Sequence, residues 1–213
     1  MRRTLLKYYH RLRARFGHRS WWPGETRIEI IVGAILTQNT AWKNVTLALD
    51  NLKRERILSV PGLRSVSETR LAQLIRSSGY FNQKARHVKE FIRFLDEHYG
   101  GSLARMARAE TSVLRRQLLS VRGIGPETAD SILCYAFDRP VFVIDAYTKR
   151  VLVRHQLTAE NATYAELQEL MMANLPADAA LFNDYHAQFV AVGHLYCKPK
   201  PQCESCPLRE FLP

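Results

Sequence analysis

Residues Leu118–Leu133 have the sequence LLSVRGIGPETADSIL. Apolar residues at helical spacing stand on both sides of a short Gly-Ile-Gly turn, which predicts two helices, over residues 111–121 and 126–137, joined by a tight hairpin. An ordinary corner between two packed helices would have the same outline. The choice between a plain corner and a ligand-binding hairpin therefore depends on the turn residues and on the charge of the chain.

The residues of the turn suit the binding of a phosphate group. Gly123 and Gly125 can adopt left-handed backbone angles and let a phosphate approach the backbone closely. Pro126 is favourable in the first turn of a helix, where free N–H groups and the helix dipole attract an anion. Arg122 and Thr128 can add contacts to the same phosphate. We therefore predict a hairpin that binds a nucleic-acid backbone without recognising bases.

Composition and charge agree with this prediction. The 213 residues are 46% hydrophobic and 24% charged, as in ordinary globular proteins, which excludes a disordered chain or a collagen. Lys and Arg number 31 and Asp and Glu 20, so the formal net charge is +11. This excess favours a polyanionic partner, with nucleic acid ahead of an anionic membrane surface. No apolar run reaches the ~18 residues of a membrane span, so we expect an intracellular, cytoplasmic protein.

The rest of the chain also has helical periodicity. Alternation typical of strands is absent over any useful length, because Val141–Ile144 is too short to count. We therefore predict an all-α fold. The further predicted helices cover residues 27–38, 41–52, 68–76, 82–99, 146–155, 164–174 and 179–195.

One acidic residue follows an apolar segment. In VFVIDAYTKRV, Val141–Val151, Asp145 comes after four apolar residues and before a predicted helix, so it is a candidate N-cap. It also lies about 20 residues after Gly125, one helix and one loop beyond the hairpin. At that place a carboxylate could instead serve catalysis on a bound nucleic acid.

Together these motifs resemble the helix-hairpin-helix DNA glycosylases of the endonuclease III superfamily. The resemblance rests on the hairpin, on Val-Ile-Asp after it, and on ILTQNT (Ile35–Thr40), GYFNQKA (Gly79–Ala85) and CKPKPQCESCPL near the C-terminus. It covers about residues 20–208. It implies two lobes with a DNA groove between them. One is a helical bundle over 26–137 that ends in the hairpin, and the other combines 1–25 with 138–213 and carries a cysteine loop.

The resemblance implies that Asp145 is the catalytic carboxylate. Cleavage of an N-glycosidic bond develops oxocarbenium charge on the deoxyribose, which a carboxylate stabilises while it orients or deprotonates the attacking water. Bifunctional members of the superfamily have a lysine in the second hairpin helix that forms a Schiff base with the sugar. Glu127 takes that position here, as either a pocket acid or an exposed helix charge. The resemblance therefore implies a monofunctional glycosylase that leaves an abasic site.

The three tryptophans lie in two short segments, WWPGE (Trp21–Glu25) and QNTAW, which ends at Trp42. Tryptophan stacks well on a flipped base, above all on a cationic one. With Glu127 in the hairpin helix, the arrangement is similar to the bacterial 3-methyladenine DNA glycosylase III branch. That similarity implies that Trp21 or Trp22, together with Trp42, sandwiches an alkylated purine. Packing in a core is the alternative for these side chains.

The resemblance assigns further positions to the DNA interface. Gln38 would enter the space left by the flipped nucleotide, or would instead form hydrogen bonds at the end of its own helix. Tyr80 would wedge into the base stack, or would cap apolar residues. Lys84, with Arg86 and His87, would lie on a helix that faces DNA.

Three of the four cysteines gather near the C-terminus as Cys197-x5-Cys203-x2-Cys206. Soft thiolates at such spacing in an intracellular protein suit an iron–sulfur cluster or zinc rather than disulfides. Cys134 lies in an apolar helix and is expected in the core.

The superfamily pattern, Cys-x6-Cys-x2-Cys-x5-Cys, implies a structural [4Fe-4S] cluster held by the three clustered cysteines, with zinc or no metal as alternatives. The first gap is one residue shorter here, and Leu212 stands at the expected fourth position. One ligand is therefore missing, and His194 is a candidate substitute. The cluster would hold a basic loop, with Lys198 and Lys200, against phosphate.

The predicted function is base excision repair: the protein would bind damaged double-stranded DNA as a monomer, flip an alkylated purine and hydrolyse its glycosidic bond with Asp145. The expected location is the nucleoid of a bacterial cytoplasm. An endonuclease III-like glycosylase and lyase acting on oxidised pyrimidines is the first alternative. A mismatch adenine glycosylase is a weaker one, because the chain is too short for a further recognition domain. A non-catalytic helix-hairpin-helix DNA-binding protein is the alternative outside enzymes.

Overall fold

Helices joined by turns make up the chain, and residues 1–19 and 21–212, which the computed structural model describes, contain no β-strand. The predicted all-α class is therefore confirmed. The chain divides into two compact units: unit 1 is Met1–Trp22 with Asp138–Pro213, and unit 2 is Pro23–Phe137. The first boundary follows Trp22 rather than residue 25. No helix in the described part of the chain is long and apolar enough to cross a membrane.

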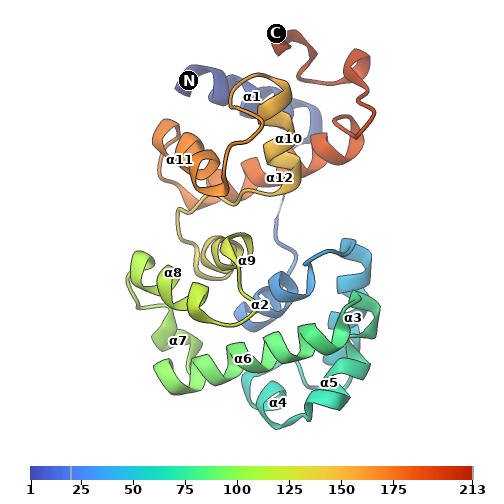
Figure 1. Ribbon diagram of the computed structural model, residues 1–213, viewed down its shortest axis with the longest axis vertical. Coiled ribbons are helices and arrows are strands. Elements are labelled where there is room, and N and C mark those ends of the chain that lie inside the picture. Colours follow the sequence, from blue (N-terminus) through green and yellow to red (C-terminus); the bar gives the residue numbers. More distant parts are fainter. Residues whose placement is uncertain (20, 213) are drawn as a thin grey trace. The chain divides into compact units, whose positions relative to one another are not determined.

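Unit 2 is built around α2 (Arg27–Leu36) and the long helix α6 (Phe81–Tyr99). Nearly every residue of α2 is buried, as its apolar sequence predicts. Helices α4 (Val60–Ser65) and α5 (Glu68–Leu74) pack on α6, and α2 also contacts it (Figure 1). The other elements of unit 2 are α3 (Trp42–Arg54), η1 (Arg76–Ser78), α7 (Leu103–Met106), α8 (Thr111–Ser120), α9 (Pro126–Ser131) and the π-helical turn η2 (Ile132–Ala136).

Unit 1 is organised by α12 (Ala179–Leu195), which packs against α10 (Ala146–Arg154) and α1 (Arg2–Phe16) (Figure 1). Its core is aromatic, and the rings of Tyr185 and Phe189 stack with centroids 4.7 Å apart. The remaining elements of unit 1 are α11 (Tyr164–Asn174), η3 (Cys203–Ser205) and η4 (Arg209–Phe211).

Helices α1, α4 and α7 are absent from the sequence-based predictions. The buried face of α1 has clear helical spacing, so the sequence carries that signal: Leu5, Tyr8, Tyr9 and Leu12. In α4, Pro61 lies in the first turn, where a helix needs no N–H donor, and Ser59 accepts a hydrogen bond from the Gly62 amide. The Pro-Gly pair therefore lies in the first turn of a helix.

The structure corrects the prediction that Lys84 faces DNA. Its side chain is only 3% exposed, and its ammonium donates to the carbonyls of Leu36, at the end of α2, and of Ser78, at 2.8 and 2.7 Å. Burial lowers the pKa of Lys84 to about 8. Lys84 therefore joins the end of α2 to the start of α6 and presents no free charge to a phosphate.

Replacing Lys84 by Met should lower the free energy of unfolding by about 1–3 kcal/mol, because two buried carbonyls lose their donor. The pKa of Lys84 is about 8 in the folded protein against its ordinary value of 10.5, so its contribution to stability rises as the pH increases from about 8 to 10.5. The deficit of Lys84→Met should thus widen over that range in denaturant titrations. Lys43→Met, on the exposed side of α3, is the matched control. A wild-type-like Lys84→Met protein would contradict the capping role.

Candidate active site

The hairpin between α8 and α9 lies in unit 2, and its two glycines differ in conformation. Gly123 has φ +90°, and a Cβ there would lie 2.2 Å from the ring of His87, so only glycine fits. Gly125 has φ −89° and ψ −179°, and a Cβ would meet open space. The prediction of left-handed angles is therefore wrong for Gly125, because the residue before Pro126 is confined to extended conformations.

Gln38 is tied to the hairpin. Its side-chain amide donates to the carbonyl oxygen of Gly123 at 2.9 Å and to the hydroxyl of Thr128 at 3.2 Å. Thr128 is buried, so its hydroxyl supports the hairpin from inside and does not lie on the surface as a phosphate contact would. Arg122 and Gly125 are exposed. Both bonds go to the hairpin between α8 and α9 and so differ from the predicted hydrogen bonds at the end of Gln38's own helix.

The remaining predicted contacts of unit 2 are accessible. Tyr80 precedes α6 in a left-handed conformation, with φ 46°, and its side chain is 67% exposed. Glu127 is exposed in the first turn of α9. Trp42 begins α3 and is half-buried. The left-handed backbone of Tyr80 is unusual for a residue with a bulky side chain, and such conformations are frequent at functional sites.

The other two tryptophans belong to unit 1. Trp21 and Trp22 are both half-buried, and their rings meet edge to face with centroids 5.8 Å apart. Neither lies in the fully buried core. Each tryptophan is therefore partly exposed, and its stacking role stays a prediction.

Asp145 is the N-cap of α10 in unit 1. Its Oδ1 accepts a hydrogen bond from the Thr148 amide at 2.7 Å, and its Oδ2 lies 3.6 Å from Nε2 of His186. Burial raises the pKa of the carboxyl, but the attraction of His186 and the bond from Thr148 outweigh burial, so the pKa lies below its usual value. The side chain of Asp145 is 13% exposed. Asp145 is thus both a helix cap and a carboxylate held in its anionic form.

The sequence-based predictions did not include His186. It lies on α12 with 6% of its side chain exposed. Its helix is otherwise lined with aromatic core residues, and the polar residues Asp184, His186 and Gln188 interrupt them. That interruption is the signal in the sequence, because polar groups enter a core only with partners.

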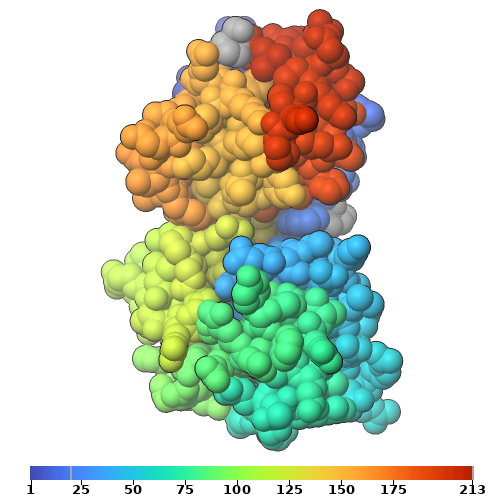
Figure 2. Space-filling view, turned by 45° about the vertical axis from the view of Figure 1, so that its right-hand side comes forward, coloured from blue at the N-terminus to red at the C-terminus, as the bar shows by residue number. Residues whose placement is uncertain are grey.

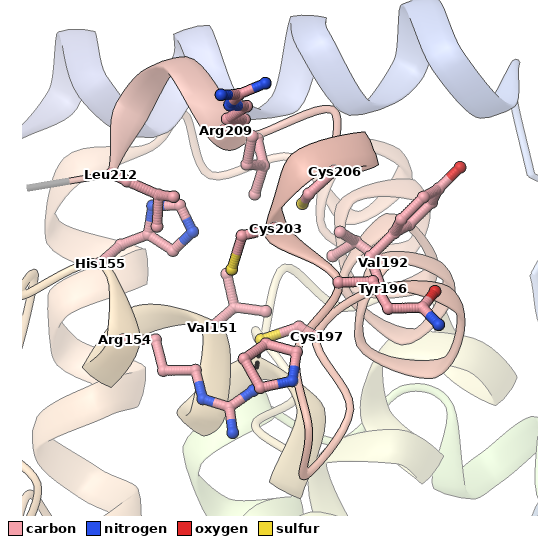
Figure 3. A pocket seen from close by; sticks show the side chains of 13 residues that line it. Val151, Arg154, His155, Val192, Tyr196, Cys197, Cys203, Cys206, Arg209 and Leu212 are labelled. Carbon is pink, nitrogen blue, oxygen red and sulfur yellow. Dashed lines mark hydrogen bonds between the residues drawn. The ribbon is translucent and has the colours of Figure 1, made fainter.

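The three clustered cysteines line one pocket of unit 1, between the end of α10 and the segment that follows α12. The pocket comprises about 360 Å³, including its opening to solvent, and its walls include Val151, His155, Val192, Leu208 and Leu212. Figure 2 shows the C-terminal segment, in red, on the surface of unit 1 beside the region of α10, in yellow-orange. The cysteine thiols face the interior of the pocket (Figure 3).

The donor type of this pocket suits a metal group with soft ligands that is large enough to span separated donors, because three thiols line one largely apolar pocket. Among residues 1–19 and 21–212, no three His, Cys, Asp or Glu side chains form a group that could hold a metal ion. His194, the predicted substitute ligand, is exposed near the end of α12 and does not line the pocket. Cys134 is buried in η2, as expected of a core thiol.

The chain is similar to known DNA repair proteins over most of its length. Residues 32–177 match the family model described as "HhH-GPD superfamily base excision DNA repair protein". Over 209 residues the chain is 46% identical to "Putative DNA repair glycosylase MJ1434" of Methanocaldococcus jannaschii, which covers 97% of this chain and 94% of that protein.

Two solved structures share the fold. The 3-methyladenine DNA glycosylase MagIII of H. pylori, bound to 1,N6-ethenoadenine, has a TM-score of 0.77 at 27% identity, over 91% of this chain and 96% of that one. A trapped covalent intermediate of endonuclease III with DNA has a TM-score of 0.84 at 21% identity, over 100% of this chain and 95% of that one. From the extent of the family match and the identity to the archaeal relative, we conclude that the chain belongs to the HhH-GPD superfamily of base excision DNA repair proteins.

Proposed function

We propose that this HhH-GPD protein is a monofunctional DNA glycosylase that removes alkylated purines from double-stranded DNA and leaves an abasic site. The observation that carries the proposal is the carboxylate of Asp145, kept anionic beside His186 at the start of α10. The proposal assigns Asp145 the catalytic role and His186 the role of a positioning residue.

Asp145 has two tasks: one of its oxygens fixes the orientation of the carboxylate, and the negative charge acts in the reaction. Oδ1 is committed to the Thr148 amide, which fixes the orientation of the carboxylate. The anion stabilises positive charge on the deoxyribose while the bond from C1′ to the base nitrogen breaks and its electron pair leaves with the base. Water then forms the new bond to C1′, and its proton passes to the carboxylate.

Substrate preference is inferred from the aromatic residues and the leaving group. An alkylated purine carries positive charge, so it leaves as a neutral base and needs little help from an acid. Trp21 or Trp22, together with Trp42, would stack on such a base, because indole faces attract cations. MagIII, a structural relative with bound ethenoadenine, supports a modified purine as the ligand.

Absence of lyase chemistry is inferred from Glu127. The superfamily resemblance puts the Schiff-base lysine of bifunctional members at this position, and a carboxylate cannot form a Schiff base with a sugar. The ammonium of Lys84 donates hydrogen bonds to two carbonyls inside unit 2, so Lys84 is a poor substitute nucleophile.

DNA binding is inferred from charge and from the hairpin. The net charge of +11 favours a polyanion, and the exposed Arg122 and backbone of Gly125 are proposed phosphate contacts. Tyr80, exposed before α6, is the proposed wedge in the base stack. The protein is proposed to act as a monomer.

A [4Fe-4S] cluster is also part of the proposal, with Cys197, Cys203 and Cys206 as ligands. When bound, such a cluster supplies covalent cross-links between its cysteine ligands and so stabilises the loop that carries them. It takes no part in breaking the glycosidic bond.

Asp145→Asn should reduce base release at least about a hundredfold, while DNA binding is retained. Asparagine is as good an N-cap as aspartate, so α10 should persist and the loss would report the missing charge. Asp178→Asn, at the N-cap of α12 in the same unit, is the matched control and should stay active. Single-turnover assays on a duplex with one alkylated purine measure the effect. Unchanged release by Asp145→Asn would refute the catalytic assignment.

His186→Gln should move the acid side of the pH–rate profile to higher pH. The change removes the partner that lowers the pKa of Asp145 most, so that only the hydrogen bonds from Thr148 still oppose burial, which raises that pKa. Base release by the variant should therefore fall at a pH where the wild type still works, and recover as the pH rises. His194→Gln, exposed on the same helix, should keep the wild-type profile. A uniform loss at every pH would point to a purely structural role for His186.

Labelled duplexes carrying one lesion each should break only after treatment with hot alkali, and the duplex with an alkylated purine should react fastest. Alkali converts an abasic site into a break, whereas a lyase breaks the strand on its own. Gel electrophoresis of paired samples, with and without alkali, measures both. Breaks without alkali on an oxidised-pyrimidine duplex would favour the endonuclease III-like alternative.

A further inference from the structure

His155 lies directly after α10 and lines the same pocket as the three clustered cysteines. It is 8% exposed, so its ring is part of the pocket wall rather than of the outer surface. Figure 3 shows the imidazole on the opposite side of the pocket from Cys206, with one ring nitrogen directed toward the cysteines. The pocket therefore contains four side chains that can bind a metal, three with sulfur and one with nitrogen.

The hydrogen bonds of His155 decide which nitrogen can bind a metal. Nδ1 lies 3.2 Å from the carbonyl oxygen of Phe211 and 2.9 Å from the hydroxyl of Tyr8. A carbonyl can only accept, so the proton belongs on Nδ1, and the Tyr8 hydroxyl in turn can donate to the same carbonyl at 3.4 Å. Nε2 is then left with a lone pair. No other residue in the described ranges hydrogen-bonds Nε2, which faces the cysteines (Figure 3).

His155 contacts the backbone next to Leu212, the position at which the fourth cysteine of the superfamily pattern is absent. Phe211 immediately precedes Leu212, the position at which the superfamily pattern has its fourth cysteine. Leu212 lines the pocket with an aliphatic side chain that cannot bind a metal. The imidazole of His155 is thus held beside Leu212, where the superfamily resemblance implies a fourth ligand.

We propose that Nε2 of His155 is the fourth protein ligand of the metal group in this loop, completing a Cys3His set with Cys197, Cys203 and Cys206. The inference rests on the proposed [4Fe-4S] cluster. Each iron of such a cluster takes one protein ligand, so the four side chains surround the cluster and need not converge on one point. Tyr8 is a positioning residue, because ligating histidines commonly hold their other ring nitrogen in a hydrogen bond that fixes the tautomer.

The charge of this ligand set distinguishes it from four cysteines. A neutral imidazole in place of a thiolate would reduce the total negative charge of the cluster and its ligands by one. This change would raise the reduction potential of the cluster. Arg154 acts in the same direction, since its guanidinium donates to Sγ of Cys197 at 3.3 Å. A cluster with this ligand set should be easier to reduce than one held by four cysteines.

The test uses the full chain, purified without oxygen, with iron and sulfide analysis and pulsed EPR of the reduced cluster. The wild type should contain four irons per chain and show coupling to a histidine nitrogen. His155→Cys should keep the iron, lose that coupling and have a lower reduction potential. His155→Ala should lose iron in air faster than the wild type. His194→Ala, outside the pocket, is the control and should match the wild type.

The outcomes separate this inference from the proposals on which it rests. Nitrogen coupling and iron retention that are unchanged in His155→Cys and His155→Ala would overturn the ligand role and leave the cluster in place. No metal in the wild type would overturn both the cluster and the Cys3His set, whereas zinc in place of iron would overturn the cluster, and zinc that is retained in His155→Ala would then overturn the ligand set as well. Base release by the wild type and by Asp145→Asn tests the glycosylase assignment separately, since Asp145 is no part of the pocket.

Discussion

Every helix end leaves backbone groups that the helix cannot pair by itself, and much of this structure consists of side chains that pair them. Asp145 caps the start of α10, and Lys84 takes the last carbonyl of α2. Gln38 donates to the carbonyl of Gly123 in the hairpin. Because most of the helices are short, such end groups are numerous, and the residues that satisfy them include several candidates for function.

Helix α10 shows how this constraint joins two parts of unit 1. Asp145 caps its first turn, while Arg150 and Arg154 near its other end donate to carbonyl oxygens of Cys197 and Lys198. The cysteine loop is thereby attached to the helix that Asp145 caps. A metal group in the loop would stabilise the far end of α10 without approaching the reaction, which is consistent with a structural role.

Burial distinguishes residues whose polar groups form hydrogen bonds inside the protein from residues whose side chains stay accessible to a ligand. Lys84 and Thr128 have the polar groups expected of phosphate contacts, but both lie inside unit 2 with their hydrogen bonds made within the protein. Arg122 and Tyr80 are exposed, and no comparable internal bond holds their side chains among the hydrogen bonds of the described residues. A residue type in a motif therefore indicates a chemistry, whereas its exposure decides whether that chemistry is available to a ligand.

The sequence by itself determined the all-α class, most helix positions and the candidate role of Asp145, because helical spacing, caps and motif order are local properties. Only the tertiary structure decided that Lys84 is buried, that His186 meets Asp145 and that His155 joins the cysteines. These facts depend on contacts between distant segments: Lys84 bonds a carbonyl 48 residues away, and Gln38 bonds one 85 residues away. Local sequence carries no record of such partners, since desolvation and pairing are set by packing.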